Sequence, residues 1–149
     1  MGNPFHVSEA AALGLHAAAI LAGTRDRRVQ AREIAVSLKA SEAHLAKVML
    51  ALRRAGIIKS VRGPAGGSML ARPPEKITLR QIYEAIEGPL KINRCMFSEP
   101  VCGRSRCGLG GFLRSVDDQV RSKLDGTKLS EFTLQLGGND GKQKKHHQS

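Results

Sequence analysis

Aromatic residues are scarce in this chain of 149 residues: they make up 3% of the sequence, with no Trp and one Tyr. Proteins that hold single-stranded nucleic acid stack its bases on aromatic rings, so the composition disfavours that mode of binding. The longest mainly apolar run, Ala10 to Ala22, contains His16 and is shorter than the ~20 residues that span a bilayer. We therefore predict no membrane partner.

The sequence also shows no pattern typical of a secretion signal or of a disulfide framework. The first ten residues do not show a basic start, an apolar middle and a small-residue cleavage site in that order. The cysteines number three, and an odd count disfavours a closed set of disulfides. These observations predict a cytoplasmic protein whose thiols serve another purpose.

Acidic residues are few beside the basic ones. Lys and Arg number 24 and Asp and Glu 13, which gives a formal net charge of +11. Such a surplus suits a polyanionic partner, nucleic acid above all. It is concentrated between Arg25 and Arg62, where ten basic residues stand against three acidic ones. Because each cation that neutralises a phosphate releases counterions, we expect this segment to bind duplex DNA with a steep salt dependence.

Helical spacing of apolar residues recurs three times in the first third of the chain. Ser8 is a plausible N-cap for a helix that reaches about Ala22. A second short helix is predicted over 31–38, and a third after the N-cap Ser41, ending before Gly56. Only three residues separate the second and third helices, which is typical of a helix-turn-helix.

The apolar period then changes to that of strands. Ile57 to Val61 and Ser68 to Ala71 flank a turn-forming stretch, Arg62 to Gly67, and this pattern predicts a β-hairpin. A hairpin that comes after a helix-turn-helix is the wing of a winged helix. The predicted fold class is therefore mostly α with a small β-hairpin wing, a winged helix-turn-helix over residues 1–90.

Two more helices are expected in the second half. Thr78 and Gln81 resemble a capping box that opens a helix from Leu79 to about Glu87. Residues 91–111 are predicted to form an irregular loop that holds the cysteines. Residues 112–136 form the C-terminal unit, with a long helix over 112–124 and one more short amphipathic piece, and residues 137–149 form a disordered basic tail.

The third helix and the hairpin carry the candidate DNA contacts. Ala43, His44 and Lys47 fall opposite the apolar stripe, where they can meet base edges in the major groove. The hairpin glycines allow the backbone to approach phosphates, and Arg62 can enter the minor groove. The alternative is that the basic residues form only a solvated face. The full candidate set is Arg32, Ser41, Ala43, His44, Lys47, Arg62, Gly63, Pro64 and Gly66.

The three cysteines, Cys95, Cys102 and Cys107, are spaced C-x6-C-x4-C and can converge on one point. Paired CxxC knuckles typical of structural zinc are absent, whereas three thiolates suit the soft iron of an iron–sulfur cluster. Zinc and free reduced thiols remain as alternatives. Without a fourth Cys, His16 is the best internal candidate for a fourth ligand. We place it on the apolar stripe with Leu13 and Ile20, a position more typical of a packed core or interface residue.

A family resemblance is visible in the hairpin and in the residues C-terminal to it. Residues 52–67 (LRRAGIIKSVRGPAGG), then LARPP at 70–74, ITL at 77–79 and IEGPL at 86–90, resemble the winged-helix iron–sulfur transcriptional regulators typified by IscR and NsrR. A three-cysteine loop and a long helix continue the match, which covers about residues 8–135. The VRGPAGG segment is its most specific motif.

The resemblance implies a homodimer whose long helices, here 112–124, cross and which binds a pseudo-palindromic double-stranded DNA operator. It also implies that Cys95, Cys102 and Cys107 ligate a [2Fe–2S] or [4Fe–4S] cluster whose state switches DNA affinity. His16 falls where some relatives place a ligating His in the first helix. Three positions depart from the family pattern, namely Ala12 and Gly110, where relatives place other ligands, and Ala46, where some place Glu.

These patterns support three functional hypotheses. The leading one is a transcriptional repressor that senses redox state, iron–sulfur status or nitric oxide through the cluster. The second is a regulator of the same fold without a cluster, using a thiol switch or zinc. The third is an enzyme with a catalytic Cys, which would need a His base and an orienting partner. The sequence offers no such triad, so we predict a protein that is not an enzyme.

Overall fold

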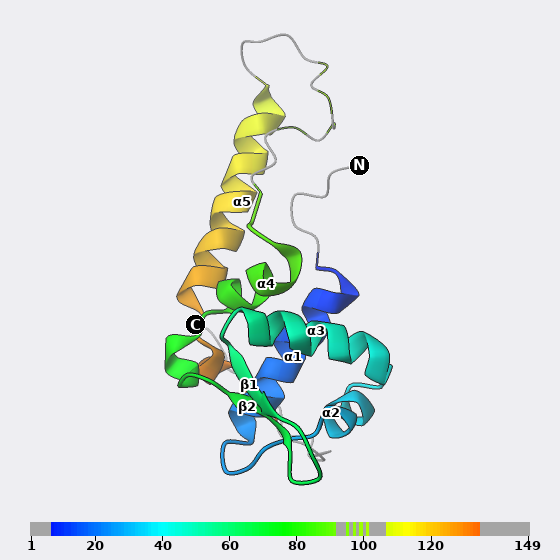
Figure 1. Cartoon of the computed structure of the whole chain (residues 1–149). Coiled ribbons are helices and arrows are strands. Elements are labelled where there is room, and N and C mark those ends of the chain that lie inside the picture. Colours follow the sequence, from blue (N-terminus) through cyan, green and yellow to red (C-terminus); the bar gives the residue numbers. More distant parts are fainter. Residues whose placement is uncertain are drawn as a thin grey trace.

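The computed structural model describes residues 7–91, 95, 97, 99, 101 and 107–134. Figure 1 shows a head made of the first four helices and a hairpin, from which the last helix projects. The predicted fold class is confirmed. In chain order the elements are α1 (Glu9–Gly23), α2 (Ala31–Ser37), α3 (Glu42–Arg54), β1 (Ile58–Val61), β2 (Gly67–Leu70), the 3-10 turn η1 (Pro74–Lys76), α4 (Leu79–Glu87), α5 (Gly108–Gly126) and the 3-10 turn η2 (Leu129–Glu131).

The helix starts result from local side-chain caps. The Ser8 hydroxyl accepts from the Ala11 N–H at 3.0 Å, and the Ser41 hydroxyl accepts from the His44 N–H at 3.1 Å. At α4, the Thr78 hydroxyl accepts from the Gln81 N–H (3.2 Å), and the Gln81 amide oxygen accepts from the Thr78 N–H (3.1 Å). Each cap satisfies a backbone N–H that has no partner inside the helix. All three predicted N-caps are confirmed.

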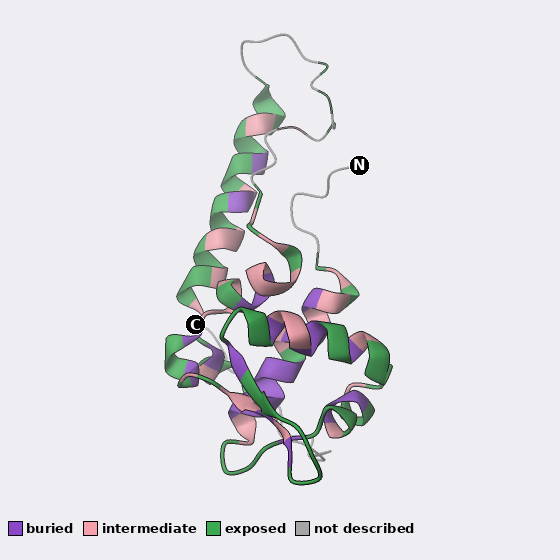
Figure 2. Cartoon of the chain, viewed as in Figure 1, coloured by how far each residue is buried: buried purple, intermediate pink, exposed green. Residues whose placement is uncertain are grey.

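The core is built around α1, which is buried on most of its circumference. Ala17, Ala18 and Ala19 are fully buried, and α3 and α4 pack against this helix. Small side chains allow the close approach: a Cβ on Gly14 would lie 3.0 Å from the Ile86 side chain. In Figure 2 the buried colour runs along α1 and the inward side of α3, whereas the hairpin tip is exposed.

The hairpin is short and is joined to the segment before α2. Its strands are antiparallel, with Ile58 opposite Leu70 and Val61 opposite Gly67. Val29 adds an isolated bridge, in which its N–H donates to the Ser68 carbonyl (2.9 Å) and its own carbonyl accepts from the Ser68 N–H (2.8 Å). The returning strand covers 67–70 rather than the predicted 68–71. The bridge to Val29 fixes the hairpin against the helix-turn-helix.

The long helix α5 begins at Gly108, four residues before the predicted start at Phe112. Glycine has a low helix propensity, so the sequence GLGG gives no local sign of a helix. The side that faces the rest of the chain is centred on Leu113 and Asp117, which are buried. The predicted stripe of Phe112, Val116, Val120 and Leu124 is only partly covered. Phe112 is 62% exposed.

The C-terminal end of the described chain returns to α1. Leu129 is fully buried, and the Leu134 N–H donates to the Ala19 carbonyl at 3.0 Å. The short piece predicted around Leu129 and Phe132 is the 3-10 turn η2. Leu136 and the predicted tail 137–149 lie outside the described residues.

Leu52→Ala is expected to destabilise the fold by about 2–5 kcal/mol, because it leaves a cavity at a fully buried position of α3. Val36→Ala is the matched control: Val36 lies on α2 and is 71% exposed, so its truncation should change stability by less than about 0.5 kcal/mol. Urea unfolding monitored by circular dichroism measures both. Equal midpoints for the two variants would contradict this description of the core.

Candidate nucleic-acid interface

The outer side of α3 is available to a partner. Ala43, Ala46 and Lys47 are exposed, while Leu45 and Val48 point into the core. His44 is half-buried, and Ser41 is exposed although its hydroxyl caps the helix. A recognition helix in the major groove presents its N-terminal turns in this way.

The turn between α2 and α3 is held tightly by backbone geometry. Lys39 adopts φ +52°, a left-handed conformation that is uncommon for residues other than glycine. The Ala40 N–H donates to the Ala35 carbonyl at 2.9 Å, which closes the turn. The angle between the two helices is therefore set locally. This arrangement confirms the predicted helix-turn-helix.

Some cations of the basic segment are neutralised within the chain. Arg27 makes a forked contact with Glu33, at 2.8 and 3.2 Å, and this contact, with the Gln30 N–H, lowers the pKa of the Glu33 carboxyl. Arg25 pairs with Glu75 at 3.1 Å. Arg32 lies 3.9 Å from Glu42, and both side chains are largely exposed. Arg32 is a predicted DNA contact, and its ion pair with Glu42 is long and exposed to solvent.

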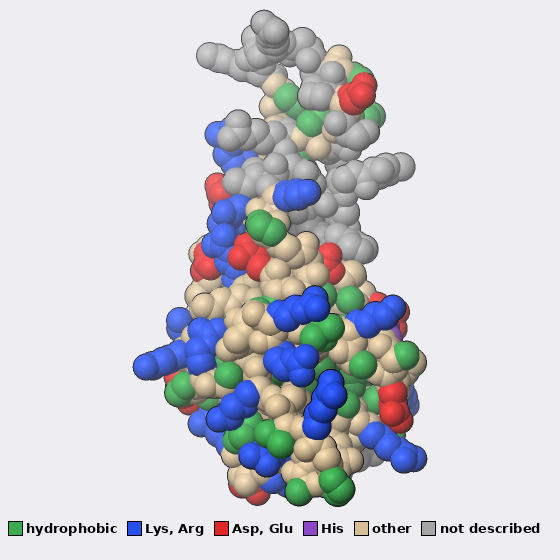
Figure 3. Space-filling view, viewed as in Figure 1, with side chains coloured by type: hydrophobic (Ala, Val, Ile, Leu, Met, Phe, Trp, Pro, Cys, Tyr) green, Lys and Arg blue, Asp and Glu red, His purple; other side chains and the backbone are tan. Residues whose placement is uncertain are grey.

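The remaining cations of α3 and the hairpin have no ion-pair partner within the described part of the chain. Figure 3 shows Lys and Arg side chains gathered over α3 and the hairpin on one face of the head. Their charge is available to phosphates, because no carboxylate at contact distance compensates it. They are Lys47, Arg53, Arg54, Lys59 and Arg62, all exposed.

The hairpin tip presents Arg62, Gly63 and Pro64 to solvent, whereas Gly66 is buried. The Gly66 N–H donates to the Gly63 carbonyl at 2.9 Å, and a Cβ at Gly66 would lie 2.2 Å from the Val61 carbonyl oxygen. Only glycine fits there. Gly66 thus shapes the turn from inside, while its neighbours form the surface.

Gln30 is a residue that the sequence pattern does not single out. Its side-chain amide donates to the Pro64 carbonyl at 3.4 Å, so it links the start of α2 to the hairpin tip.

Arg53 and Arg54 are counted in the basic segment of the sequence but are not among the predicted DNA contacts. Arg53 lines a groove of about 400 Å³ between α3 and the hairpin, together with Ala46, Leu50, Ser60 and Val61. The 3.6-residue period of α3 places both arginines away from the core. This pattern could have identified them as candidate DNA contacts.

Two of the three cysteines lie in the described part of the chain. Cys95 is half-buried and Cys107 exposed, and both are free thiols. Cys107 is the residue directly before α5, at its N-cap position. Cys102 lies outside the described residues. Within the described ranges, no group of three or more His, Cys, Asp or Glu residues is arranged to hold a metal ion.

His16 lies three and four residues from the buried Leu13 and Ile20 on α1 but is itself exposed, so the expectation of a packed core residue is wrong and that of an interface residue stays a prediction. The C-terminal segment covers the neighbouring turn of α1 at Ala19 and leaves His16 open. Its Nδ1 lies 2.7 Å from the Ala12 carbonyl oxygen, and its ring meets Phe132 edge-on at 6.4 Å between centroids. An Nδ1–H that donates to this carbonyl leaves Nε2 available as a ligand.

No α-helix in the described ranges is long and apolar enough to cross a bilayer. The groove, the exposed cations and the hairpin all belong to the head of the structure.

Comparison with known proteins agrees with this geometry. Residues 7–134 match the family model of Rrf2, described as an iron-dependent transcriptional regulator. An HTH-type transcriptional regulator of Aquifex aeolicus is 33% identical over 128 residues, which cover 84% of this chain and 89% of that protein. The HTH-type transcriptional regulator IscR of Aliivibrio salmonicida is 32% identical over 94 residues, 63% of this chain and 56% of that protein.

A solved structure shares the fold. CymR (YrzC), the global cysteine regulator of B. subtilis, has a TM-score of 0.74 at 27% identity, covering 87% of this chain and 99% of that chain. Members of the matched family are transcriptional regulators and not enzymes. The winged helix, the uncompensated basic face and the match over residues 7–134 lead to one conclusion: this chain belongs to the Rrf2 family of DNA-binding transcriptional regulators.

Proposed function

We propose that this regulator is a homodimeric repressor, active in the cytoplasm, whose affinity for a double-stranded DNA operator is switched by an iron–sulfur cluster. The observation that carries the DNA-binding half is the set of exposed cations on α3 and the hairpin, for which the described residues provide no ion-pair partner. The switch rests on the cysteines that flank and occupy the segment between α4 and α5.

The exposed residues among the predicted DNA contacts, and the half-buried His44, each receive a role. Lys47 donates to guanine O6 or N7, and Ala43 and His44 lie against neighbouring base edges. Ser41 and Arg32 approach the backbone beside the helix-turn-helix. Arg62 enters the minor groove, with Gly63 and Pro64 against the sugar-phosphate chain. Gly66 contributes by shaping the turn.

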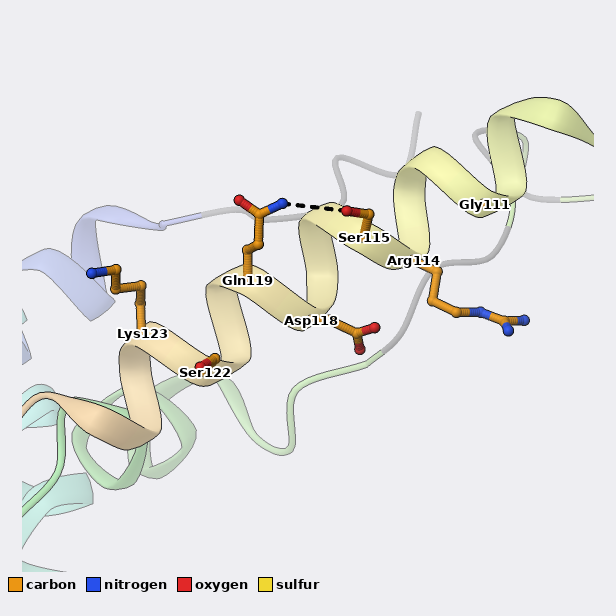
Figure 4. Close-up of a pocket in the computed structure, with 7 residues that line it drawn as sticks. All are labelled: Gly111, Arg114, Ser115, Asp118, Gln119, Ser122 and Lys123. Atoms are coloured by element: carbon orange, nitrogen blue, oxygen red, sulfur yellow. Dashed lines mark hydrogen bonds between the residues drawn. The ribbon is translucent and has the colours of Figure 1, made fainter.

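The homodimer is supported by an apolar seam on α5. Leu109 is 58% and Phe112 62% exposed, and Val116 and Val120 continue the same side at helical spacing. A second copy would cover this seam, because such side chains gain free energy by leaving water. The opposite side of α5 is polar: Figure 4 shows a shallow groove with Arg114, Asp118 and Lys123 among its side chains.

The donor set fits an iron–sulfur group. Cys95 and Cys107 are free thiols, and soft iron prefers thiolate sulfur. The N-terminal end of α5 lies beside Cys107 and favours a negatively charged ligand there. Cys95, Cys102 and Cys107 would hold the cluster, which supplies iron that responds to redox state and nitric oxide. His16 of a second copy is the proposed fourth ligand, through the Nε2 that the Nδ1–Ala12 contact leaves available.

The protein residues transmit the change. Three thiolates bound at one point would restrict the segment from Lys91 to Cys107 and so fix the start of α5 relative to the end of α4. In a dimer this sets how far apart the two recognition helices lie. The two states must then differ in operator affinity, because a ligand shifts an equilibrium only through differential binding.

A second candidate is a regulator that uses the thiols directly or binds zinc. The structural likeness to CymR, named the global cysteine regulator of B. subtilis, supports it. The two candidates share the DNA-binding head and the dimer. They differ in what the cysteines hold.

Arg62→Ala is expected to weaken operator binding by about 1–3 kcal/mol and to reduce the salt slope by about 1, because one cation is removed from the DNA. Fluorescence anisotropy over a salt series, with a duplex selected from a random-sequence pool by the wild-type protein, measures both. Lys76→Ala, on η1 and outside the helix-turn-helix and hairpin, serves as control. Identical affinity and slope for Arg62→Ala and wild type would refute the proposed contact.

Cys102→Ala is expected to abolish or strongly reduce bound iron and sulfide while leaving a folded dimer. Protein purified without oxygen from a host that builds clusters is analysed for iron, sulfide and visible absorbance. Arg62→Ala should keep its colour in the same preparation. Wild-type protein with stoichiometric zinc, or with no metal, would favour the second candidate instead.

Phe112→Ala is expected to raise the dimer dissociation constant by about tenfold or more, since a large exposed ring is removed from the proposed seam. Arg114→Ala, on the polar side of α5, is the matched control and should leave the constant unchanged. Sedimentation over a concentration series gives both values. A dimer that is weakened by Arg114→Ala and not by Phe112→Ala would assign the interface to the other side.

A further inference from the structure

The helix α5 is attached to the head mainly near its C-terminal end. The Leu79 N–H donates to the Thr127 carbonyl at 3.1 Å, and the Leu129 N–H donates to the Ile77 carbonyl at 2.8 Å. These bonds join the end of α5 to the start of α4. Figure 1 shows the rest of α5 extending away from the head. The direction of the helix therefore depends on the contacts that its side makes with the rest of the chain.

One such contact is an ionic network centred on Arg80 of α4. Its Nε donates to Glu84 Oε1 at 3.1 Å, and its Nη1 donates to both carboxylate oxygens of Asp125 at 3.0 and 3.2 Å. Arg80 therefore binds its own helix and α5 at once. A planar guanidinium held at both edges is a rigid link, which a lysine could not reproduce.

Within the network, the Arg80–Glu84 pair is better shielded than the other ion pairs in the described part of the chain, whereas the Asp125 side chain is 48% exposed. The Arg80 and Glu84 side chains are 27% and 29% exposed, whereas those of Arg27 and Glu33 are 48% and 40% exposed. Partly buried charges are less screened by salt than exposed ones. The Arg80–Glu84 pair is thus suited to hold a fixed geometry under cellular conditions.

The same network reaches Leu90, which lies in the connection between α4 and the cysteines. Glu84 Oε1 also accepts from the Leu90 N–H at 2.9 Å, and Arg121 Nη2 lies 3.5 Å from the Leu90 carbonyl oxygen. The Leu90 N–H, and after it Arg80, lowers the pKa of the Glu84 carboxyl. Glu84 therefore stays ionised at neutral pH. The end of α4, Leu90 and two turns of α5 are held together.

A small tilt at this point has a large effect at the far end of α5. From Arg121 to Leu109 the helix spans about 18 Å at 1.5 Å per residue, so a tilt of about 10° moves its tip by about 3 Å. That distance is close to the rise of one base pair, about 3.4 Å. In a dimer joined through this end of α5, the tilt changes the separation of the two recognition helices.

We propose that Arg80 is a positioning residue that fixes the direction of α5 relative to the head and thereby selects the spacing between the two half-sites of the operator. The inference rests on the proposed homodimer. Arg80 does not touch the DNA in this role. It acts by holding Asp125 of α5 and Glu84 of α4 at a fixed separation.

The test measures discrimination between half-site spacings. A duplex selected from a random-sequence pool by wild-type protein is rebuilt with one base pair added or removed at its centre. We expect wild-type protein to bind the altered duplexes at least tenfold more weakly. Arg80→Ala should reduce that ratio to threefold or less. Lys76→Ala removes the same charge from an exposed site and should keep the wild-type ratio.

Asp125→Asn is the second variant, because it weakens the link to α5 and keeps the Arg80–Glu84 pair. It should lose discrimination in the same way, with dimerisation and thermal unfolding near wild type. A folded dimer of either variant that retains the wild-type ratio would overturn the role of Arg80. A monomeric wild-type protein would instead overturn the proposed homodimer, and a dimeric wild-type protein that is indifferent to spacing would overturn the role of Arg80. The two failures are thus distinguished by the wild-type measurement.

Discussion

The burial of α1 is the constraint on which the rest of the head depends. This helix is rich in alanine, and Ala17, Ala18 and Ala19 are fully buried. Small side chains let α3 and α4 approach it closely, and Gly14 has room for little more than a hydrogen beside Ile86. Close packing of this kind resists displacement. The helices that surround α1 are therefore held at fixed angles, and the surface they carry is fixed as well.

The outer surface of the head is a consequence of that packing. Once Leu45, Val48 and Leu52 of α3 face α1, the opposite side of α3 must face solvent, and its charged residues lie there together. The hairpin is placed beside it by Val29 and Gln30. α3 and the hairpin each form through local interactions. The packing places them side by side, and their basic residues then form one face.

The segment with the cysteines lies between two elements that are already connected. The end of α4 and the last turns of α5 share the Arg80 network, and Leu90 belongs to it. A chemical change at the thiols would act next to this connection. The same architecture could serve a cluster, a metal ion or a thiol reaction, because each changes the constraint on the chain between α4 and α5.

Local interactions made much of this fold predictable from the sequence. Ser8, Ser41 and Thr78 cap helices through bonds to residues three positions away, so their effect has a short-range signature. The glycine-rich turn of the hairpin is equally local. These features determined the order of elements, the helix-turn-helix and the hairpin.

Tertiary structure decided the rest. Because α1 is buried on most sides, the spacing of its apolar residues does not show that His16 is left exposed between the buried Leu13 and Ile20. The bonds from Gln30 to Pro64 and from Arg80 to Asp125 join residues 34 and 45 positions apart. Such pairs leave no local pattern, because only the packing around α1 brings them within hydrogen-bond distance.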